Sequence, residues 1–132
     1  MTIHYGDDKL VRGSEVREMY VEAGWSLLGS RETSDIEESI RHSNVFVTAR
    51  DGAKLIGFVS ALSDRAYYAH VTEFLVRRSH QGRGIGSELI RSLLAALSRE
   101  QVITIFAEPD AEVFYRRFGF ASTAGGLMLR KT

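Results

Sequence analysis

Apolar and polar residues are arranged so that a strand, a turn and a helix follow one another near the middle of the chain. β-branched and aromatic residues dominate from Val71 to Val76, as they do in a largely buried strand. From Ile85 to Leu97 the apolar residues instead recur every three or four positions, which is typical of an amphipathic helix. Glycines at positions 82, 84 and 86 separate the two segments. They allow a tight turn and the close approach of a ligand.

The rest of the chain predicts helices and strands on either side of this junction. Periodicity and turn signals predict, in chain order, a strand at 3–5, helices at 14–24 and 33–43, strands at 45–48 and 54–62, a strand at 102–107, a helix at 109–118, and a last hairpin of residue 120 with residues 127–129. The order is β-α-α-β-β-β-α-β-α-β-β. It predicts a mixed α/β (α+β) fold with an antiparallel front half.

Two helix starts carry capping signals. Ser14 is the expected N-cap of the first helix, because a serine hydroxyl accepts a backbone hydrogen bond from the first turn. In the second helix Ser34 is followed three positions later by Glu37, a spacing that predicts a capping box.

Length and composition favour a globular protein with one domain over residues 1–132. Lys and Arg number 17 and so do Asp and Glu, so no overall field favours nucleic acid or an anionic membrane. The chain has no cysteine, which excludes disulfides and thiolate metal sites, and its histidines lack metal-ligand spacing. It shows no signal core and no apolar run of bilayer length. We expect a cytoplasmic protein without a metal, a nucleic-acid partner or a membrane segment.

The glycine-rich turn predicts an anion site. The free N–H groups and the positive dipole end of the following helix suit a pyrophosphate. The turn reads Gln81-Gly82-Arg83-Gly84-Ile85-Gly86, which lacks the Gly-Lys-Ser/Thr of a P-loop and the spacing of the dinucleotide fingerprint. A glycine-rich connection without a ligand is the other interpretation.

This turn resembles the QxxGxG motif that binds acyl-CoA in the GNAT superfamily, the GCN5-related N-acetyltransferases. The resemblance implies a single-domain GNAT fold, with a mostly antiparallel mixed sheet, helices on both faces, and a central strand that splays from its neighbour and carries a bulge. It also implies acetyl-CoA as cofactor. The implied contacts are Phe74, Leu75 and Val76 for the pantetheine arm, and Gln81, Gly82, Arg83, Gly84, Ile85, Gly86 and Ser87 for the pyrophosphate.

A second motif, Glu112 to Phe120, is similar to the FYxxxGF signature of the same family. The resemblance implies that Tyr115 lies near the thioester sulfur and acts as the general acid; packing in the core is the alternative role for this ring. Glu108 stands where relatives often carry an asparagine that holds the pantetheine arm. That contact is therefore expected to be altered or missing.

Two residues of the central strand are candidates for the general base that an amine acceptor needs. His70 matches a position that carries a catalytic Glu or His in some relatives, and its ordinary pKa suits the task. Glu73 is a carboxylate within an apolar strand, which implies either a role or a buried ion pair. In a regular strand residues three apart face opposite sides. A bulge would let both side chains face one site.

Two further features have both a functional and a structural interpretation. Trp25 follows the first helix, where the family often builds the wall of the acceptor site, but a lone tryptophan also suits a core. Arg77, Arg78 and Arg83 could bind the 3′-phosphate of the nucleotide, although solvated arginines are the commoner case.

The resemblance thus implies an acetyl-CoA-dependent N-acetyltransferase that transfers acetyl directly to a primary amine of a small molecule. Two alternatives stay open: acetylation of a protein or peptide, and a non-catalytic module that senses acyl-CoA. The sequence does not identify the acceptor or choose between His70, Glu73 and a water as the base. A homodimer is also expected, because the last hairpin would leave an edge that can pair between subunits.

Overall fold

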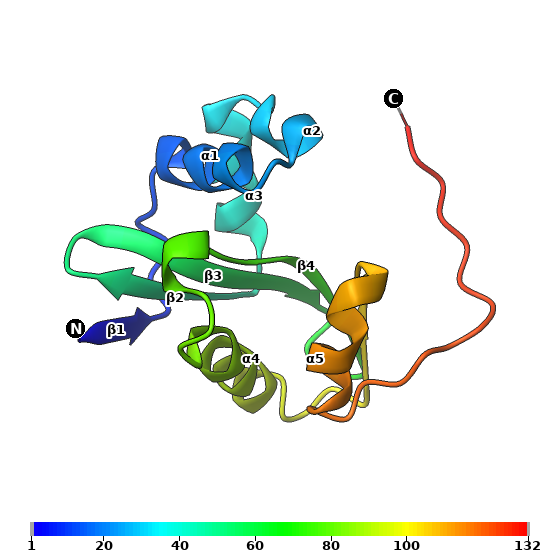
Figure 1. Ribbon diagram of the computed structural model, residues 1–132. Coiled ribbons are helices and arrows are strands. Elements are labelled where there is room, and N and C mark those ends of the chain that lie inside the picture. Colours follow the sequence, from blue (N-terminus) through cyan, green and yellow to red (C-terminus); the bar gives the residue numbers. More distant parts are fainter. Residues whose placement is uncertain (1, 132) are drawn as a thin grey trace.

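Five strands form the central sheet of the computed structural model, which describes residues 2–131 (Figure 1). They lie side by side in chain order: β1 (Ile3–Gly6), β2 (Val45–Asp51), β3 (Lys54–Ser63), β4 (Tyr68–Val76) and β5 (Val102–Ile105). Pairing is antiparallel from β1 to β4, and β5 alone runs parallel to its neighbour. The predicted mixed, mostly antiparallel sheet is confirmed.

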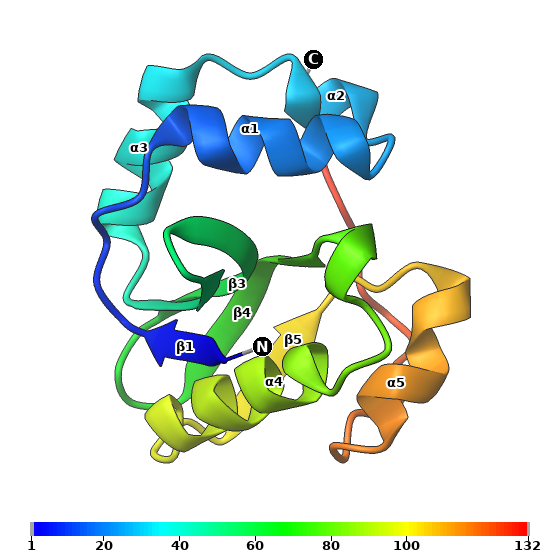
Figure 2. The ribbon, with the colours of Figure 1, turned by 60° about the vertical axis from the view of Figure 1, so that its left-hand side comes forward.

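Helices cover both faces of this sheet (Figures 1 and 2). On one face lie α1 (Gly13–Glu22), α2 (Ser26–Gly29) and α3 (Thr33–His42), and on the other lies α4 (Ile85–Ala96). Two 3₁₀ turns, Arg78–His80 and Pro109–Ala111, precede α4 and α5 (Glu112–Arg116) respectively. The single turn α2 was not predicted, and it matters because it borders the cleft described below.

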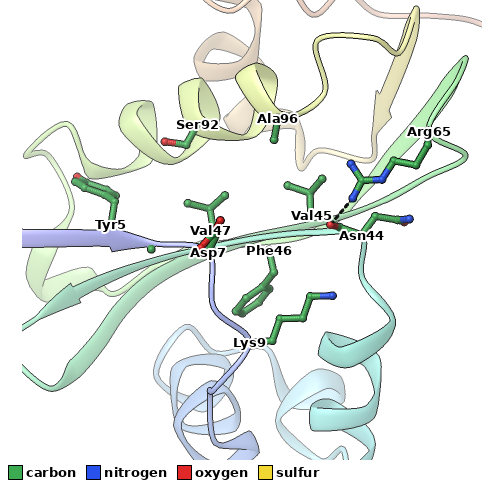
Figure 3. A pocket seen from close by; sticks show the side chains of 11 residues that line it. Tyr5, Asp7, Lys9, Asn44, Val45, Phe46, Val47, Arg65, Ser92 and Ala96 are labelled. Carbon is green, nitrogen blue, oxygen red and sulfur yellow. Dashed lines mark hydrogen bonds between the residues drawn. The ribbon is translucent and has the colours of Figure 1, made fainter.

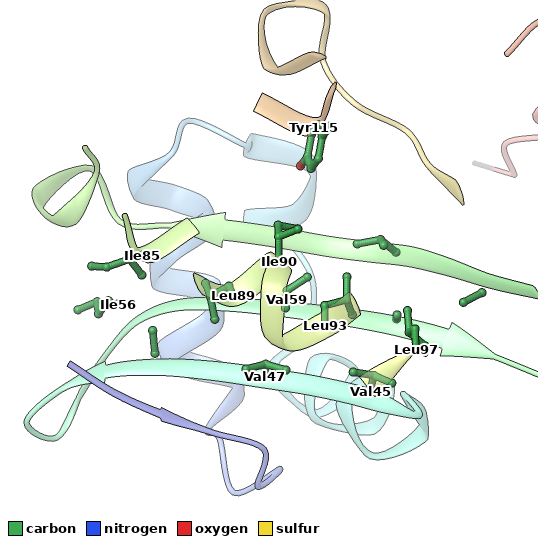
Figure 4. Close-up of a cluster of buried hydrophobic side chains, with 14 residues drawn as sticks. Val45, Val47, Ile56, Val59, Ile85, Leu89, Ile90, Leu93, Leu97 and Tyr115 are labelled. Atoms are coloured by element: carbon green, nitrogen blue, oxygen red, sulfur yellow. The ribbon is translucent and has the colours of Figure 1, made fainter. Parts of the chain in front are cut away.

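The core has two layers because successive strand residues point to opposite faces. In β2, for example, Val45 and Val47 pack toward α4, whereas Phe46 packs toward α1 and α3. The predicted apolar stripe of α4 fills the first layer with Ile85, Leu89, Ile90, Leu93 and Leu97 (Figure 4). The second layer is filled by Val11, Val16, Met19, Tyr20, Ile36, Ile40, Phe46, Leu55, Phe58 and Leu75.

The bulge expected in the central strand is present in β4. Glu73 is in register with Ser60 of β3, but the next residue of β3 is in register with Val71. Thr72 is therefore an extra residue, and its hydroxyl lies 2.7 Å from that of Ser60. An extra residue shifts the alternation by one position. Because of this shift, His70 and Glu73 face the same side of the sheet.

The expected splay is also present, between β4 and β5. Their parallel pairing runs from Tyr68 with Val102 to Val71 with Ile105 and then stops. The strand β4 continues for five more residues to Val76. Along those residues β4 forms no ladder with β5, which leaves room for a ligand between the two strands.

The predicted last hairpin is wrong. No strand follows α5 in the described residues, and the chain from 121 to 131 runs as an extended tail (Figure 1). Phe120 packs against the Tyr115 ring, with 5.9 Å between centroids, instead of starting a strand. Leu127 and Leu129 are 97% and 85% exposed. The intervening small residues, with Gly125 and Gly126 among them, supply little side chain to hold a strand in place.

Both predicted helix caps are also wrong. Helix α1 begins one residue earlier than expected, at Gly13, and Ser14 lies inside it. The N-cap position of α3 is Glu32, whose side chain makes no capping hydrogen bond, so Ser34 is already helical. Glu37 instead accepts a 2.7 Å hydrogen bond from the backbone of Gly13, because α1 and α3 pack together at this point. The Glu37 side chain thus binds a residue of another helix and not the N-terminus of its own helix.

Candidate active site

A cleft of about 1060 Å³ opens where β4 and β5 separate. This volume is at the upper end of the range for small-molecule sites, roughly 300–1,000 Å³. One side of the cleft is β4 from Val71 to Val76, and the other is formed by residues 105–108 and by α5. The start of α4 closes one end. Trp25 and Leu28 contribute from the α2 side of the sheet.

The end of the cleft beside α4 is made largely of backbone. Gly82 and Gly84 have φ angles of +76° and +80°, which side chains with a Cβ rarely adopt. A Cβ at either position would meet no heavy atom within 4 Å, so this backbone borders open space. Gly84 is the residue from which α4 begins, and the free N–H groups of the first helical turn follow it. These features fit a phosphate group.

The predicted cofactor segment is held in place by its glutamine. The side chain of Gln81 donates a 2.9 Å hydrogen bond to the carbonyl of Val76, at the end of β4. Of the predicted pantetheine and pyrophosphate contacts, Phe74, Leu75, Val76, Gln81, Gly82, Gly84, Ile85, Gly86 and Ser87 all line the cleft. Arg83 does not line it.

Aromatic rings form the wall next to this segment. Phe74 of β4 and Phe114 of α5 are stacked, with 5.7 Å between centroids. A Cβ on Gly86 would lie 3.3 Å from the Phe74 ring. Glycine at position 86 therefore lets α4 pack closely against the rings, which is a different role from that of Gly84.

Tyr115 reaches the cleft from α5 and is 8% exposed (Figure 4). Its ring packs edge to face against Phe74, at 6.0 Å between centroids. Burial raises the pKa of Tyr115 to about 12, so its hydroxyl carries a proton at neutral pH. Within residues 2–131 this hydroxyl has no hydrogen-bond partner. It is therefore available to a ligand in the cleft.

Glu73 lines the cleft on the face of the sheet that carries α2. Burial raises the pKa of Glu73 above its ordinary value, while Arg31 lowers it through a hydrogen bond and its charge. The Nη1 of Arg31 lies 3.1 Å from the Glu73 carboxylate. The Glu73 side chain is 21% exposed and that of Arg31 48%, so water or a small ligand can reach both.

His70 lies on the same face as Glu73 but does not line the cleft. Its Nδ1 is 2.8 Å from the Thr104 hydroxyl, and its ring packs on Phe106 at 5.0 Å between centroids. Phe106 does line the cleft. The contact of His70 with the cleft is thus through a neighbouring ring.

Of the three arginines that could bind the 3′-phosphate, Arg77 is occupied by contacts within the protein. Arg77 is 5% exposed, and its Nε donates a 2.7 Å hydrogen bond to the Leu55 carbonyl. Its Nη1 contacts Glu18 at 2.8 Å and Glu22 at 2.5 Å. Arg77 therefore anchors α1 to the sheet and is not free to bind a nucleotide phosphate.

Sequence reasoning missed Arg31 and Arg130, both of which line the cleft. Neither lies in a motif, so only the spatial arrangement identifies them. Trp25 lines the cleft and also stacks on the buried Tyr20 ring, at 5.9 Å between centroids. Glu108 also lines the cleft.

A second cavity, of about 520 Å³, lies beside the end of β1 and the start of β2 (Figure 3). Its walls include Tyr5, Lys9 and Ser92, and Arg65 donates a 2.8 Å hydrogen bond to the Asn44 carbonyl at its rim. None of the predicted site residues lines this cavity. Apart from His70 and Arg83, the predicted site residues line the first cleft.

Comparison with known proteins assigns the family. A family model described as an acetyltransferase (GNAT) domain matches residues 16–128. The chain belongs to the GNAT family. An N-acetyltransferase of Porphyra purpurea named ycf52 and called uncharacterized is 25% identical over 131 residues, covering 95% of this chain and 74% of the relative. The protein is therefore an N-acetyltransferase by family.

Two further proteins are similar in fold or in sequence. A probable acetyltransferase of Staphylococcus aureus, SA2161, has a crystal structure that superposes with a TM-score of 0.86 at 20% identity, covering 98% of this chain and all of the other. That similarity concerns the fold alone. The protein named histone acetyltransferase TAP1 of Glycine max is 37% identical over 76 residues, which are 56% of this chain and 33% of the relative.

Two other kinds of feature were sought in residues 2–131, a membrane-spanning helix and a metal site. No helix among them is long and apolar enough to cross a membrane. In the same residues no three His, Asp or Glu side chains are grouped so that they could hold a metal ion.

Proposed function

We propose that this GNAT enzyme transfers acetyl from acetyl-CoA directly to a primary amine of a small molecule. The observation that carries the proposal is that one cleft contains the glycine cradle at Gly82 and Gly84, the protonated Tyr115 and the carboxylate of Glu73. A phosphate site, an acid and a base in one cleft are what acyl transfer from a thioester to an amine requires.

The residues present fit the cofactor. The backbone from Gln81 to Ser87 would hold the pyrophosphate at the start of α4, where a Cβ-free surface borders the cleft. The unpaired edge of β4 at Phe74, Leu75 and Val76 would hold the pantetheine arm. Acetyl-CoA, when bound, supplies the thioester whose carbonyl carbon is attacked.

Each of the residues in the cleft then has its own part in the reaction. Glu73 accepts a proton from the acceptor amine, directly or through water, so that nitrogen attacks as the neutral amine. A C–N bond forms and the C–S bond breaks. Tyr115 donates its proton to the departing sulfur, a role that its pKa of about 12 permits at neutral pH. Backbone N–H groups of β4 polarise the carbonyl, as in an oxyanion hole.

Between the two candidate bases we favour Glu73. It lines the cleft and is partly open to solvent, whereas His70 is held by Thr104 and contacts the cleft through Phe106. We retain His70 as the second candidate, because both side chains face the same side of the sheet.

Acetylation of a protein is the competing function, and the relative named as a histone acetyltransferase favours it. The tail argues for a small acceptor, because Met128 and Arg130 line the same cleft as Trp25 and narrow the approach that a folded protein would need. A sensor that binds acyl-CoA without turnover would not need a proton donor, so the unpaired Tyr115 hydroxyl favours an enzyme.

A thiol-release assay with DTNB tests the proposal. The purified protein is incubated with acetyl-CoA and a panel of polyamines, amino sugars, aminoglycosides, arylalkylamines, amino acids and peptides. We expect CoA release with at least one small amine, and acetylated product by mass spectrometry. Binding of acetyl-CoA without release from any acceptor would favour the sensor, and release with peptides alone would favour protein acetylation.

We also propose that the enzyme is a homodimer in the cytoplasm. β5 is an edge strand of the sheet, and the nearby tail exposes Leu127 and Leu129, so unpaired backbone and apolar side chains are both accessible to a second copy. Sedimentation equilibrium should give twice the chain mass of 14.8 kDa. A monomer at all concentrations would contradict the dimer.

A further inference from the structure

The end of the cleft away from the glycine cradle combines one carboxylate with an arginine. It includes Trp25, Leu28, Arg31 and Glu73, and Arg130 of the tail lines the same cleft. These residues come from α2, from the turn after it, from β4 and from the C-terminal segment. This is the α2 side of the sheet, which Glu73 faces, so an amine that reaches Glu73 also reaches Arg31.

Arg31 and Glu73 form an ion pair with a single 3.1 Å contact through Nη1. Both charged groups act on the nearby Tyr20: burial raises the pKa of Tyr20 most, Glu73 raises it further, and Arg31 lowers it. The guanidinium has five N–H donors in a planar fork, and half of the Arg31 side chain is exposed. It therefore has the capacity to bind a second anion.

An acceptor amine meets a specific electrostatic problem at this place. To give its proton to Glu73, the amine must come within a few ångströms of the Arg31 guanidinium, and two cations in a half-buried site repel each other. An acceptor that carries its own anionic group avoids this repulsion, because that group pairs with Arg31 while the amine pairs with Glu73. Charge then stays balanced when the ligand displaces water.

We propose that the acceptor is an amine with a carboxylate close to it, as in an amino acid with an apolar or aromatic side chain, and that Arg31 binds that carboxylate. This inference rests on the proposed acetyl transfer. The apolar part of such an acceptor would lie against Trp25 and Leu28, which border the same end of the cleft. Arg130 also lines this cleft and adds a second positive charge to it.

The test compares L-phenylalanine with L-phenylalaninamide as acceptors. The two differ only in the carboxylate, and the amide has the less basic amine, so a preference for the acid cannot arise from a larger fraction of neutral amine. We expect kcat/KM to be roughly ten- to a hundredfold higher for the acid, as for one charge-assisted hydrogen bond. Arg31→Met should bring the ratio to about one, mainly through KM, and Arg31→Lys should restore part of it.

Arg41→Met is the matched control. Arg41 is also a half-exposed arginine paired with one glutamate, Glu38, but it lies on α3 and outside the cleft. This variant should keep the wild-type preference. Loss of the preference in Arg41→Met as in Arg31→Met would overturn the assignment, because it would point to overall charge.

A binding measurement separates this inference from the proposed function. In the presence of CoA, N-acetyl-L-phenylalanine should bind the wild type more tightly than its amide in calorimetry, and Arg31→Met should abolish the difference. CoA release with other amines, but no preference for the acid in rate or binding, would overturn the inference and leave the acetyltransferase intact. No release of CoA with any amine would instead refute the proposed function. The difference in binding between the acid and the amide would still show whether Arg31 binds the carboxylate.

Discussion

The two ends of the cleft are built in different ways. The proposed cofactor end is one continuous segment, Gln81 to Ser87, and presents mainly backbone whose shape depends on Gly82 and Gly84. The acceptor end is assembled from side chains that are far apart in sequence, such as Arg31 and Glu73, which are 42 positions apart. Backbone can recognise the phosphate that every acyl-CoA shares, whereas separate side chains can change one by one as the acceptor changes.

The largest effect is expected from Gly84→Glu at the cofactor end. A glutamate there would bring a negative charge and a disfavoured φ of +80° to the phosphate cradle. We expect acetyl-CoA affinity to fall by more than about a hundredfold in isothermal titration calorimetry. The control is Gly52→Glu, where φ is +60°, a Cβ meets nothing within 4 Å, and the residue lies outside the cleft. Micromolar binding by Gly84→Glu would refute the pyrophosphate assignment.

Tyr115→Phe, between the two ends, should separate chemistry from binding. Loss of a general acid lowers kcat by roughly a hundredfold, while the affinity for acetyl-CoA should change little because the ring packing remains. Steady-state kinetics and calorimetry on the same preparation measure both. Tyr67→Phe removes a hydroxyl from an exposed tyrosine and should leave kcat unchanged. An unaltered kcat in Tyr115→Phe would eliminate the acid role.

Glu73→Gln at the acceptor end should lower kcat/KM by about tenfold, since a water can replace part of a missing base. The wild-type rate should decline as pH falls through the pKa of Glu73, because only the carboxylate accepts a proton. That pKa lies above the ordinary value through burial, with Arg31 opposing the shift. This acidic limb should disappear in Glu73→Gln, and in Arg31→Met it should move to higher pH.

Glu38→Gln, in an ion pair outside the cleft, is the control for this pH profile and should retain the limb. If Glu73→Gln kept the acidic limb of the wild-type pH profile, Glu73 would not be the base, and another group would have that role.

The smallest effect is expected from His70→Gln. An amide can keep the hydrogen bond to Thr104, and the side chain does not line the cleft, so kcat/KM should fall only about twofold, within the range of a packing change. A loss as large as that of Glu73→Gln, measured in the same assay, would make His70 the base.

Much of the fold could be predicted because its signals are local. Alternating apolar residues predicted the strands, and the stripe from Ile85 to Leu97 predicted α4. The failures occurred where a tertiary contact outweighed a local preference. Glu37 binds the backbone of Gly13 instead of capping its own helix, and Phe120 packs on Tyr115 instead of opening a hairpin.

The backbone turn at the proposed cofactor end could be predicted from the sequence alone, since a phosphate cradle requires only a few neighbouring residues with the right backbone freedom. Tertiary structure decided the acceptor end. Whether His70 and Glu73 share a face depended on the bulge at Thr72, and Arg31 entered the site only because α2 and its following turn fold over β4. Arg77, which the sequence placed near the phosphates, became an anchor for α1. Distances between side chains depend on the packing of elements, and no local pattern encodes them.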